Sequence, residues 1–97
     1  MTRVEFEWDE GNNTKNYSKH GVSCLEAESV FQDDYRLDFT DPFHSISEKR
    51  YLTLGRSNRP RILIIAWTLR GIKVRIISAR PASKKERAVY ETQKKIK

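Results

Sequence analysis

The sequence predicts an α+β domain in which the helices and an antiparallel sheet are segregated along the chain. One alternating segment comes first, two segments with helical signals follow, and four strand-like segments and a basic helix complete the chain. The connections between the strand-like segments are too short for the crossover helices that a parallel sheet needs. At 97 residues, the chain suits a single domain with one small core.

The N-terminal part predicts a strand and then a short helix. Residues 4–8 alternate apolar and charged side chains, as in a strand with one buried face. A polar helix is expected over residues 9–20, because Lys19 and His20 place cations in its last turn and a glycine follows.

The second helix has clearer signals. Ser23 and Glu26 have the spacing of a capping box, in which each side chain bonds the backbone N–H of the other residue. Apolar residues recur at helical spacing over residues 24–31. Two consecutive aspartates after Gln32 oppose the helix dipole, so the helix should end there.

The rest of the chain predicts four strands and a final helix. The strands are expected over residues 36–40, 49–54, 62–69 and 73–80. The third strand is almost continuously apolar, so it should lie at the centre of the sheet. Residues 55–60 are expected to form a turn, and Arg70 with Gly71 the hairpin turn before the last strand. Ser83 and Glu86 form a second capping box that opens the helix.

Charge is divided unevenly along the chain. Residues 1–48 carry 4 basic and 11 acidic side chains, whereas residues 49–97 carry 15 basic and 2 acidic ones. If this polarity survives folding as one basic face, the expected partner is a polyanion, and nucleic acid is the most obvious one. The alternative is a solvated surface on which the charges of the two halves mix.

Several classes of protein are excluded. No apolar run approaches the roughly 20 residues of a membrane span, and the N-terminus has no basic and apolar signal segment. We therefore expect a cytoplasmic protein without membrane contact. One cysteine cannot form an internal disulfide, and with two histidines it cannot complete the usual zinc site. No metal or cofactor is expected.

Five short motifs, in this order, resemble the BrnT-type toxins. They are Phe6 to Asp9, Lys19 to Ser23, Gly55 with Arg56, Arg75 to Arg80, and Glu86 to Tyr90. The resemblance implies one BrnT-like toxin domain over residues 1–97. It also implies a RelE-like fold, with an N-terminal strand and two helices packed on a four-stranded antiparallel sheet and a C-terminal helix.

The resemblance further implies a function and partners. A protein of this kind is expected to be the toxin of a bacterial type II toxin-antitoxin pair, a metal-independent endoribonuclease that inhibits translation. Its partner is expected to be a BrnA-type antitoxin with a ribbon-helix-helix DNA-binding part. The toxin would then contact RNA itself, and DNA only through the antitoxin.

Three arginines are the first candidates for catalysis. Cleavage of RNA without a metal must stabilise extra negative charge on the phosphate, and a guanidinium can do so directly. Arg80 comes first, because it closes the last strand just before the helix cap. Arg75 lies five residues earlier, so the two share a pocket only if the strand bulges. For Arg75, an exposed position or an ion pair with an acid of the first half is the alternative. Arg56, in a glycine turn, is free to reach substrate, and an inert surface arginine is the alternative.

Five further residues are weaker candidates. Lys19 and His20 are the next catalytic candidates, and His20 is a natural general acid or base because an unperturbed histidine titrates near neutrality. Helix capping explains this pair equally well. Arg87, Glu86 and Tyr90 are candidates for substrate binding. Glu86 has a capping role as its alternative, and Tyr90 could stack on a base or pack its helix on the sheet.

The residues also suit a second function. The sequence shows no clear pair of histidine and glutamate for acid-base catalysis. A non-catalytic RNA- or protein-binding module on the same scaffold is therefore the alternative. Such a module would bind RNA with a strong dependence on salt and release no products.

Overall fold

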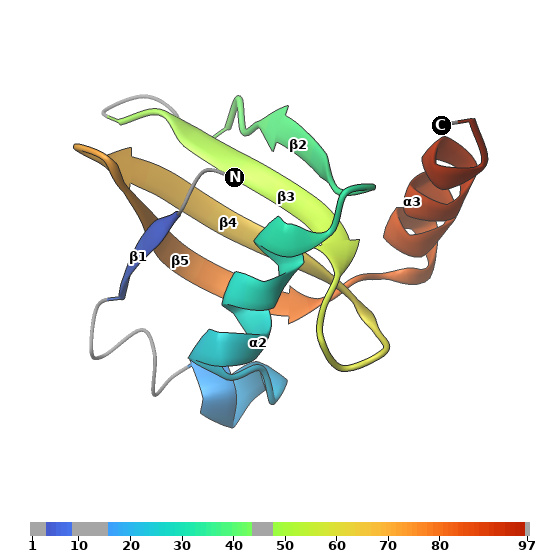
Figure 1. The fold of residues 1–97 in the computed structure, drawn as a ribbon, viewed down its shortest axis with the longest axis horizontal. Coiled ribbons are helices and arrows are strands. Elements are labelled where there is room, and N and C mark those ends of the chain that lie inside the picture. Colours follow the sequence, from blue (N-terminus) through green and yellow to red (C-terminus); the bar gives the residue numbers. More distant parts are fainter. Residues whose placement is uncertain (1–3, 9–15, 44–47, 97) are drawn as a thin grey trace.

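The computed structural model describes residues 4–8, 16–43 and 48–96. They form a sheet with α2 across one face and α3 beside one end (Figure 1). The elements in chain order are β1 (Glu5–Trp8), α2 (Cys24–Ser29), a 3-10 turn η1 (Val30–Gln32), β2 (Leu37–Thr40), β3 (Arg50–Arg56), β4 (Ile62–Arg70), β5 (Lys73–Pro81) and α3 (Lys84–Ile96).

The sheet has five strands in the order β1-β5-β4-β3-β2. The four strands β2 to β5 are antiparallel, as predicted. The N-terminal strand differs from the prediction, because β1 joins the sheet as a fifth strand, parallel to β5, instead of packing on it. Its alternating pattern fixes which side chains are buried. The pattern carries no information about which edge the strand joins or in which direction.

The helices follow the predicted order. Residues 16–20 are helical, and the expected start of that helix lies outside the described residues. The second helical run ends at Gln32, as predicted. Only half of its capping box forms, with Ser23 Oγ accepting from the N–H of Glu26 at 3.2 Å. The Glu26 carboxylate instead binds Arg61 and Ser57, far along the chain.

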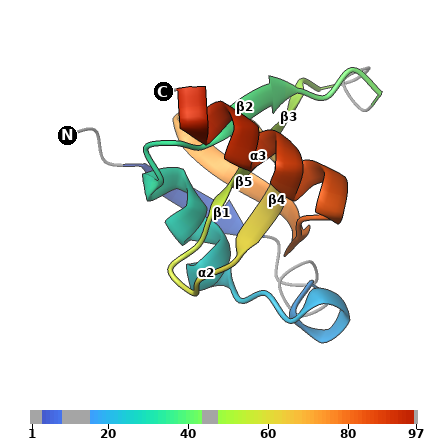
Figure 2. The ribbon, with the colours of Figure 1, turned by 90° about the vertical axis from the view of Figure 1, so that its right-hand side faces the viewer.

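The sheet has a core on each side. The larger cluster lies under α2 and includes Leu63 and Ile65 of β4. The smaller cluster lies toward α3 and includes Ile62 and Ile64 of the same strand together with Tyr90. β4 is therefore covered on both faces, as its continuous apolar run predicts. Figure 2 shows α3 in front of the ends of the strands.

The turn expected at residues 55–60 begins later, because Gly55 and Arg56 still pair within β3. Gly55 serves close packing instead of a turn. A Cβ at this position would lie 2.9 Å from Val30 Cγ1 and 3.2 Å from Asp33 Oδ2. The glycine lets η1 approach the backbone of β3 closely.

Gly55→Ala should therefore destabilise the protein. We expect the free energy of unfolding to fall by about 2 kcal/mol, because the added methyl group must displace packed neighbours. Urea denaturation followed by circular dichroism would measure the change. An unaltered midpoint would show that η1 does not press on β3 as described.

No helix within residues 4–8, 16–43 and 48–96 is long and apolar enough to cross a membrane.

Candidate active site

A bulge in β5 brings two candidate arginines to one face. The pairing of β5 with β4 skips Ile77, which is an extra residue in its strand. One extra residue reverses the alternation of side chains beyond it. Ile76 and Ala79 are three residues apart, yet both are buried in the cluster under α2. Arg75 and Arg80 therefore both point away from α2, although they are five residues apart.

Arg56 lies on the same face. In β4, Ile62 stands opposite Arg56, and Ile64 stands opposite Arg80. Both isoleucines belong to the cluster toward α3, so the two arginines flank it on the side away from α2. Two strand spacings, about 10 Å, separate their strands. We call this surface the arginine face, and it is defined by Arg50, Arg56, Arg75 and Arg80.

Arg80 is held by the cap of α3. Its Nη1 and Nη2 each donate to one oxygen of Glu86 at 2.9 Å. Glu86 also accepts from the N–H of Ser83 at 2.8 Å, and its own N–H donates to Ser83 Oγ, so the predicted second capping box is confirmed. The guanidinium and the cap hold the pKa of Glu86 at about 2. A carboxyl with so low a pKa is a poor general base near neutral pH.

Arg75 is held by the strand beside it. Arg75 stands directly opposite Glu7 of β1, and its Nη1 donates to Glu7 Oε1 at 2.9 Å. An ion pair with an acid of the first half of the chain was the alternative prediction for Arg75. The structure contains such a pair, between Arg75 and Glu7. By contrast, Arg56 has an exposed side chain with no ion pair among the described residues.

Tyr90 anchors α3 to the rest of the protein. Only 1% of Tyr90 is exposed, and its hydroxyl donates to Asp33 Oδ2 at 2.6 Å. The same oxygen accepts from the N–H of Arg56 at 2.8 Å. Burial alone would raise the pKa of Asp33, but these hydrogen bonds lower it below its usual value. The packing alternative for Tyr90 fits this geometry, since no base can reach the ring while α3 stays in place.

Tyr90→Phe should loosen this anchor. The change removes one hydrogen bond to a carboxylate and keeps the ring, so we expect the free energy of unfolding to fall by about 1.5 kcal/mol. Urea denaturation would measure it. Tyr17→Phe is the matched control because the Tyr17 ring is 60% exposed, and it should leave the midpoint unchanged. Equal effects of the two variants would contradict the anchoring role.

The remaining candidates lie on α3 and in the helical segment beside the edge of β5. Arg87 is exposed in the first turn of α3, and its Nη1 donates to Ala82 O at 2.9 Å. Lys19 is exposed and His20 is half-buried. Their helical segment is fixed to the edge of β5, because Asn16 Oδ1 accepts from the N–H of Ala79 at 2.8 Å. In the described part of the chain, no hydrogen bond or ion pair joins Lys19 or His20 to the arginines.

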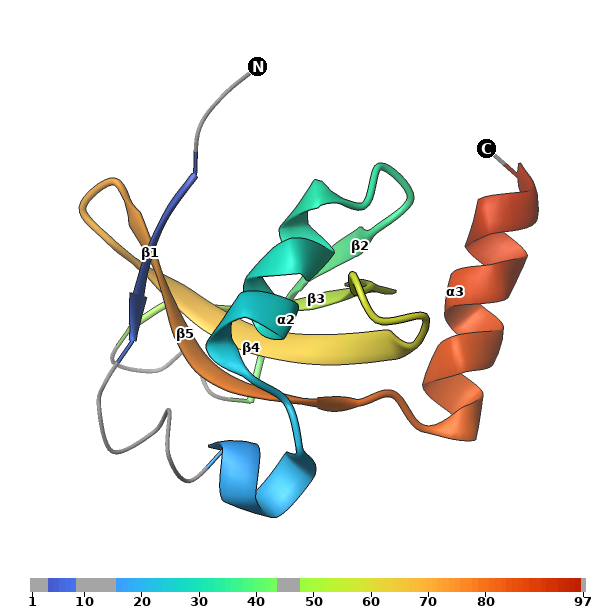
Figure 3. The ribbon, with the colours of Figure 1, turned by 60° about the horizontal axis from the view of Figure 1, so that its bottom comes forward.

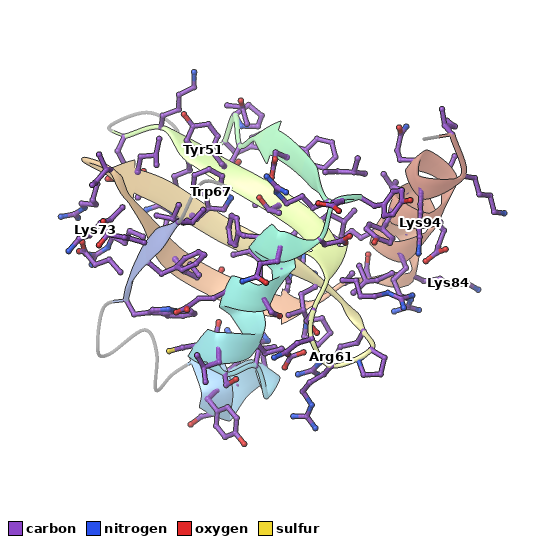
Figure 4. All side chains as sticks on the ribbon, in the orientation of Figure 1. Tyr51, Arg61, Trp67, Lys73, Lys84 and Lys94 are labelled. Carbon is purple, nitrogen blue, oxygen red and sulfur yellow. The ribbon has the colours of Figure 1, made fainter. Side chains whose placement is uncertain are left out.

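Sequence reasoning missed an ion pair between Arg61 and the buried carboxylate of Glu26 on the α2 side. Arg61 Nε donates to Glu26 Oε2 at 2.6 Å, and Arg61 Nη2 donates to the carbonyl of Gly21 at 2.8 Å. Ser57 donates to the same carboxylate at 2.7 Å. Figure 4 shows Arg61 beside α2. The sequence does contain a signal for this pair. Glu26 lies four residues before the buried Val30, on the apolar stripe of its helix, so its carboxylate is buried and needs a partner.

Within the described residues, no three histidine, cysteine, aspartate and glutamate side chains gather closely enough to hold a metal ion.

Comparison with known proteins agrees with the motifs. The family model for the ribonuclease toxin BrnT of type II toxin-antitoxin systems matches residues 8–86. The chain belongs to the BrnT family. This confirms the resemblance that the five motifs indicated, and a type II toxin implies an antitoxin partner.

The BrnT fold is also seen in a solved structure. The crystal structure of the Brucella abortus ribonuclease toxin BrnT is similar, with a TM-score of 0.61 and 24% sequence identity. The match covers 84% of this chain and 100% of that chain. At this identity the likeness bears on the fold alone, and it agrees with the α+β architecture. No curated protein matches this BrnT chain.

Proposed function

We propose that this protein is a metal-independent endoribonuclease of the RelE-like type, and that its cleavage of RNA inhibits translation. In this proposal, a BrnA-type antitoxin with a ribbon-helix-helix part neutralises the toxin. Membership of the BrnT family supports the proposal. The observation that carries it is the bulge at Ile77, which turns Arg75 and Arg80 toward the same face as Arg56.

The arginines would act on charge that develops at the phosphate. When the 2′-hydroxyl attacks, the phosphate gains negative charge, and guanidinium groups held in place stabilise it without reorganisation. Arg80 can do this while paired. A guanidinium has five N–H donors, and Arg80 uses three of them on Glu86 and on the carbonyl of Pro81. Its Nε–H and one Nη2–H are left for a phosphate oxygen.

The other candidates take supporting roles in this proposal. Arg56 has an exposed side chain and provides a mobile phosphate contact, and Arg87 adds a second from α3. Glu86 and Glu7 orient Arg80 and Arg75 through their ion pairs.

Proton transfer is assigned to the segment at the edge of β5. We propose His20 as the general acid or base, with Lys19 beside it as a further cation. The low pKa of Glu86 argues against that carboxyl as the base.

RNA cleavage in the presence of excess EDTA tests the proposal. We expect the purified protein to cleave single-stranded RNA at the same rate with and without the chelator, because the charge is supplied by arginines. Addition of the antitoxin should stop cleavage. A preparation that binds its antitoxin but releases no RNA fragments would contradict the nuclease assignment.

The ion pairs favour a second candidate function. Two of the three central arginines already face a carboxylate, which suits a non-catalytic RNA-binding module. This alternative predicts salt-sensitive RNA binding, with a slope set by the number of phosphates that the protein neutralises, and intact RNA after long incubation.

A further inference from the structure

Three exposed apolar side chains gather at the end of the sheet opposite α3. Leu69 is exposed near the end of β4, and Ile72 is exposed in the turn before β5. Val4 is also exposed, and it lies beside Ile72 because the residues that follow each of them pair between β1 and β5. Figure 3 shows the β4–β5 hairpin and β1 at one end of the sheet and α3 at the other. We call Val4, Leu69 and Ile72 the hairpin patch.

The hairpin patch adjoins a layer of aromatic rings under η1. Phe6 and Leu69 both stand opposite Val74, which is buried in the cluster under α2, so both side chains lie on the α2 side of the sheet. Phe6 contacts Phe31 of η1 with the ring centroids 5.3 Å apart, and Phe31 contacts Trp67 with the centroids 5.6 Å apart. The exposed side chains of the patch therefore extend a half-buried apolar surface toward the hairpin.

The aromatic layer also reaches β3. Tyr51 stacks on Trp67 with the ring centroids 4.6 Å apart, and both residues are half-buried. Figure 4 shows the two side chains together on the face of the sheet that carries α2. Single exposed apolar side chains are ordinary and require no ligand. An exposed group of them that continues a half-buried apolar layer is typical of a surface that binds another protein.

Cations border the hairpin patch. Arg70 and Lys73 stand opposite each other at the ends of their strands and flank the turn that holds Ile72. Lys49 lies beside Leu69, because the neighbours of these two residues pair between β3 and β4. All three cations are exposed, and within the described residues no hydrogen bond or ion pair involves their charged groups.

Nearby acids do not balance these cations. Glu48 forms an ion pair with Arg50 at 3.8 Å. Glu5 stands opposite Lys73. Among the described residues at this end of the sheet, the three cations therefore exceed the acids that are left for them. The rim of the patch is positive, and it complements a partner that is apolar at the centre of its contact and acidic around it.

We propose that the hairpin patch is a docking surface for the antitoxin. The antitoxin segment that binds there places apolar side chains on Val4, Leu69 and Ile72 and carboxylates among the surrounding cations. The inference rests on the antitoxin partner, which membership of the BrnT family implies, and adds to the proposed function the surface that holds this partner. It does not depend on cleavage of RNA, because the patch lies on the α2 side of the sheet and the arginine face lies on the other.

The chemistry of the patch favours this occupant over RNA and over a second copy of the chain. The side chains of the patch are aliphatic, whereas a nucleobase binds by stacking on a flat ring or a guanidinium. In a symmetric dimer, the patch of each copy would face the same patch of the other, so the cations at the two rims would repel each other. An acidic antitoxin segment matches both the apolar centre and the positive rim.

Calorimetric titration with the purified antitoxin of the same pair tests the proposal. We expect Ile72→Glu to weaken antitoxin binding by about 10-fold or more, because it removes an apolar contact and adds a charge that repels acidic groups. Leu69→Glu should act in the same direction. Ile96→Glu is the matched control, since Ile96 at the end of α3 is 72% exposed and Ile72 is 83% exposed. RNA cleavage by the free toxin should be the same in all three variants.

The positive rim is tested separately. Arg70→Ala leaves the apolar centre intact and removes one cation beside it. This variant should slow association with the antitoxin, and the difference from wild type should disappear at high salt, because exposed charges mainly steer the encounter. An association rate equal to that of wild type at low salt would contradict the role of the rim.

The outcomes separate this inference from the nuclease assignment. Wild-type antitoxin affinity in Ile72→Glu and Leu69→Glu would overturn the docking surface, and so would equal losses in Ile72→Glu and Ile96→Glu. If the patch variants keep the antitoxin and lose RNA binding or self-association, RNA or a second copy occupies the patch and the proposal is wrong. A wild-type protein that binds the antitoxin through the patch and releases no RNA fragments would overturn the nuclease assignment and leave this inference standing.

Discussion

Arg80→Ala is expected to lower the turnover of RNA cleavage by about 100-fold or more, as the loss of one preorganised charge donor does in other enzymes. RNA affinity should fall much less, because the remaining arginines still contact phosphates. Single-turnover kinetics with excess enzyme, together with the dissociation constant for uncleavable RNA, would separate the two effects.

The control for this variant is Glu86→Gln. Both changes break the pair of hydrogen bonds between the Arg80 guanidinium and the Glu86 carboxylate, so both should weaken the cap of α3. Only Arg80→Ala removes the positive charge from the arginine face. Glu86→Gln should lower turnover less, because it removes the orienting partner of Arg80 and keeps the guanidinium. Equal losses of turnover in the two variants would contradict a catalytic role for the charge of Arg80.

Arg61→Ala is expected to cost about 3 kcal/mol in the free energy of unfolding. The Glu26 side chain is only 2% exposed, and removing its partner leaves a buried carboxylate that is costly to keep charged. Urea denaturation at neutral pH would measure the loss. Arg59→Ala is the control, because Arg59 lies exposed in the same loop and should change the midpoint little.

The stability loss of Arg61→Ala should depend on pH. The hydrogen bond from Arg61 lowers the pKa of Glu26 below its usual value. The pair therefore contributes stability above the unfolded pKa of about 4.3, and this contribution is lost as the pH falls through the folded value. The difference between wild type and variant should shrink below about pH 4. A difference that stays constant down to pH 3 would contradict the account.

Much of the fold could be predicted because each element carries its own local pattern. The covered central strand β4 and the cap of α3 are examples. The place of β1 could not be predicted, since alternation says nothing about the neighbour of a strand. Gly55 was misread as a turn residue for a related reason, because its close contact with Val30 comes from a segment distant in sequence.

The candidate site was predictable only in its residue types. The basic second half of the chain indicated arginines as the candidates. The alternation of side chains in a strand indicated that Arg75 and Arg80 could face the same side only if the strand contained a bulge. Nothing local marks Ile77 as the extra residue, because the register depends on how β5 pairs with β4. The partners of these arginines, Glu7 and Glu86, likewise follow from tertiary pairing and from the helix cap.

The account depends on one face binding one RNA strand, and NMR of the arginine Nε–H groups tests this directly. During titration with a short uncleavable RNA strand, the signals of Arg56, Arg75 and Arg80 should shift together with one dissociation constant. The signals of Arg59 and Arg61, on the α2 side, should stay in place. Shifts confined to Arg59 and Arg61, or separate dissociation constants for the three arginines, would contradict a single RNA site on the arginine face.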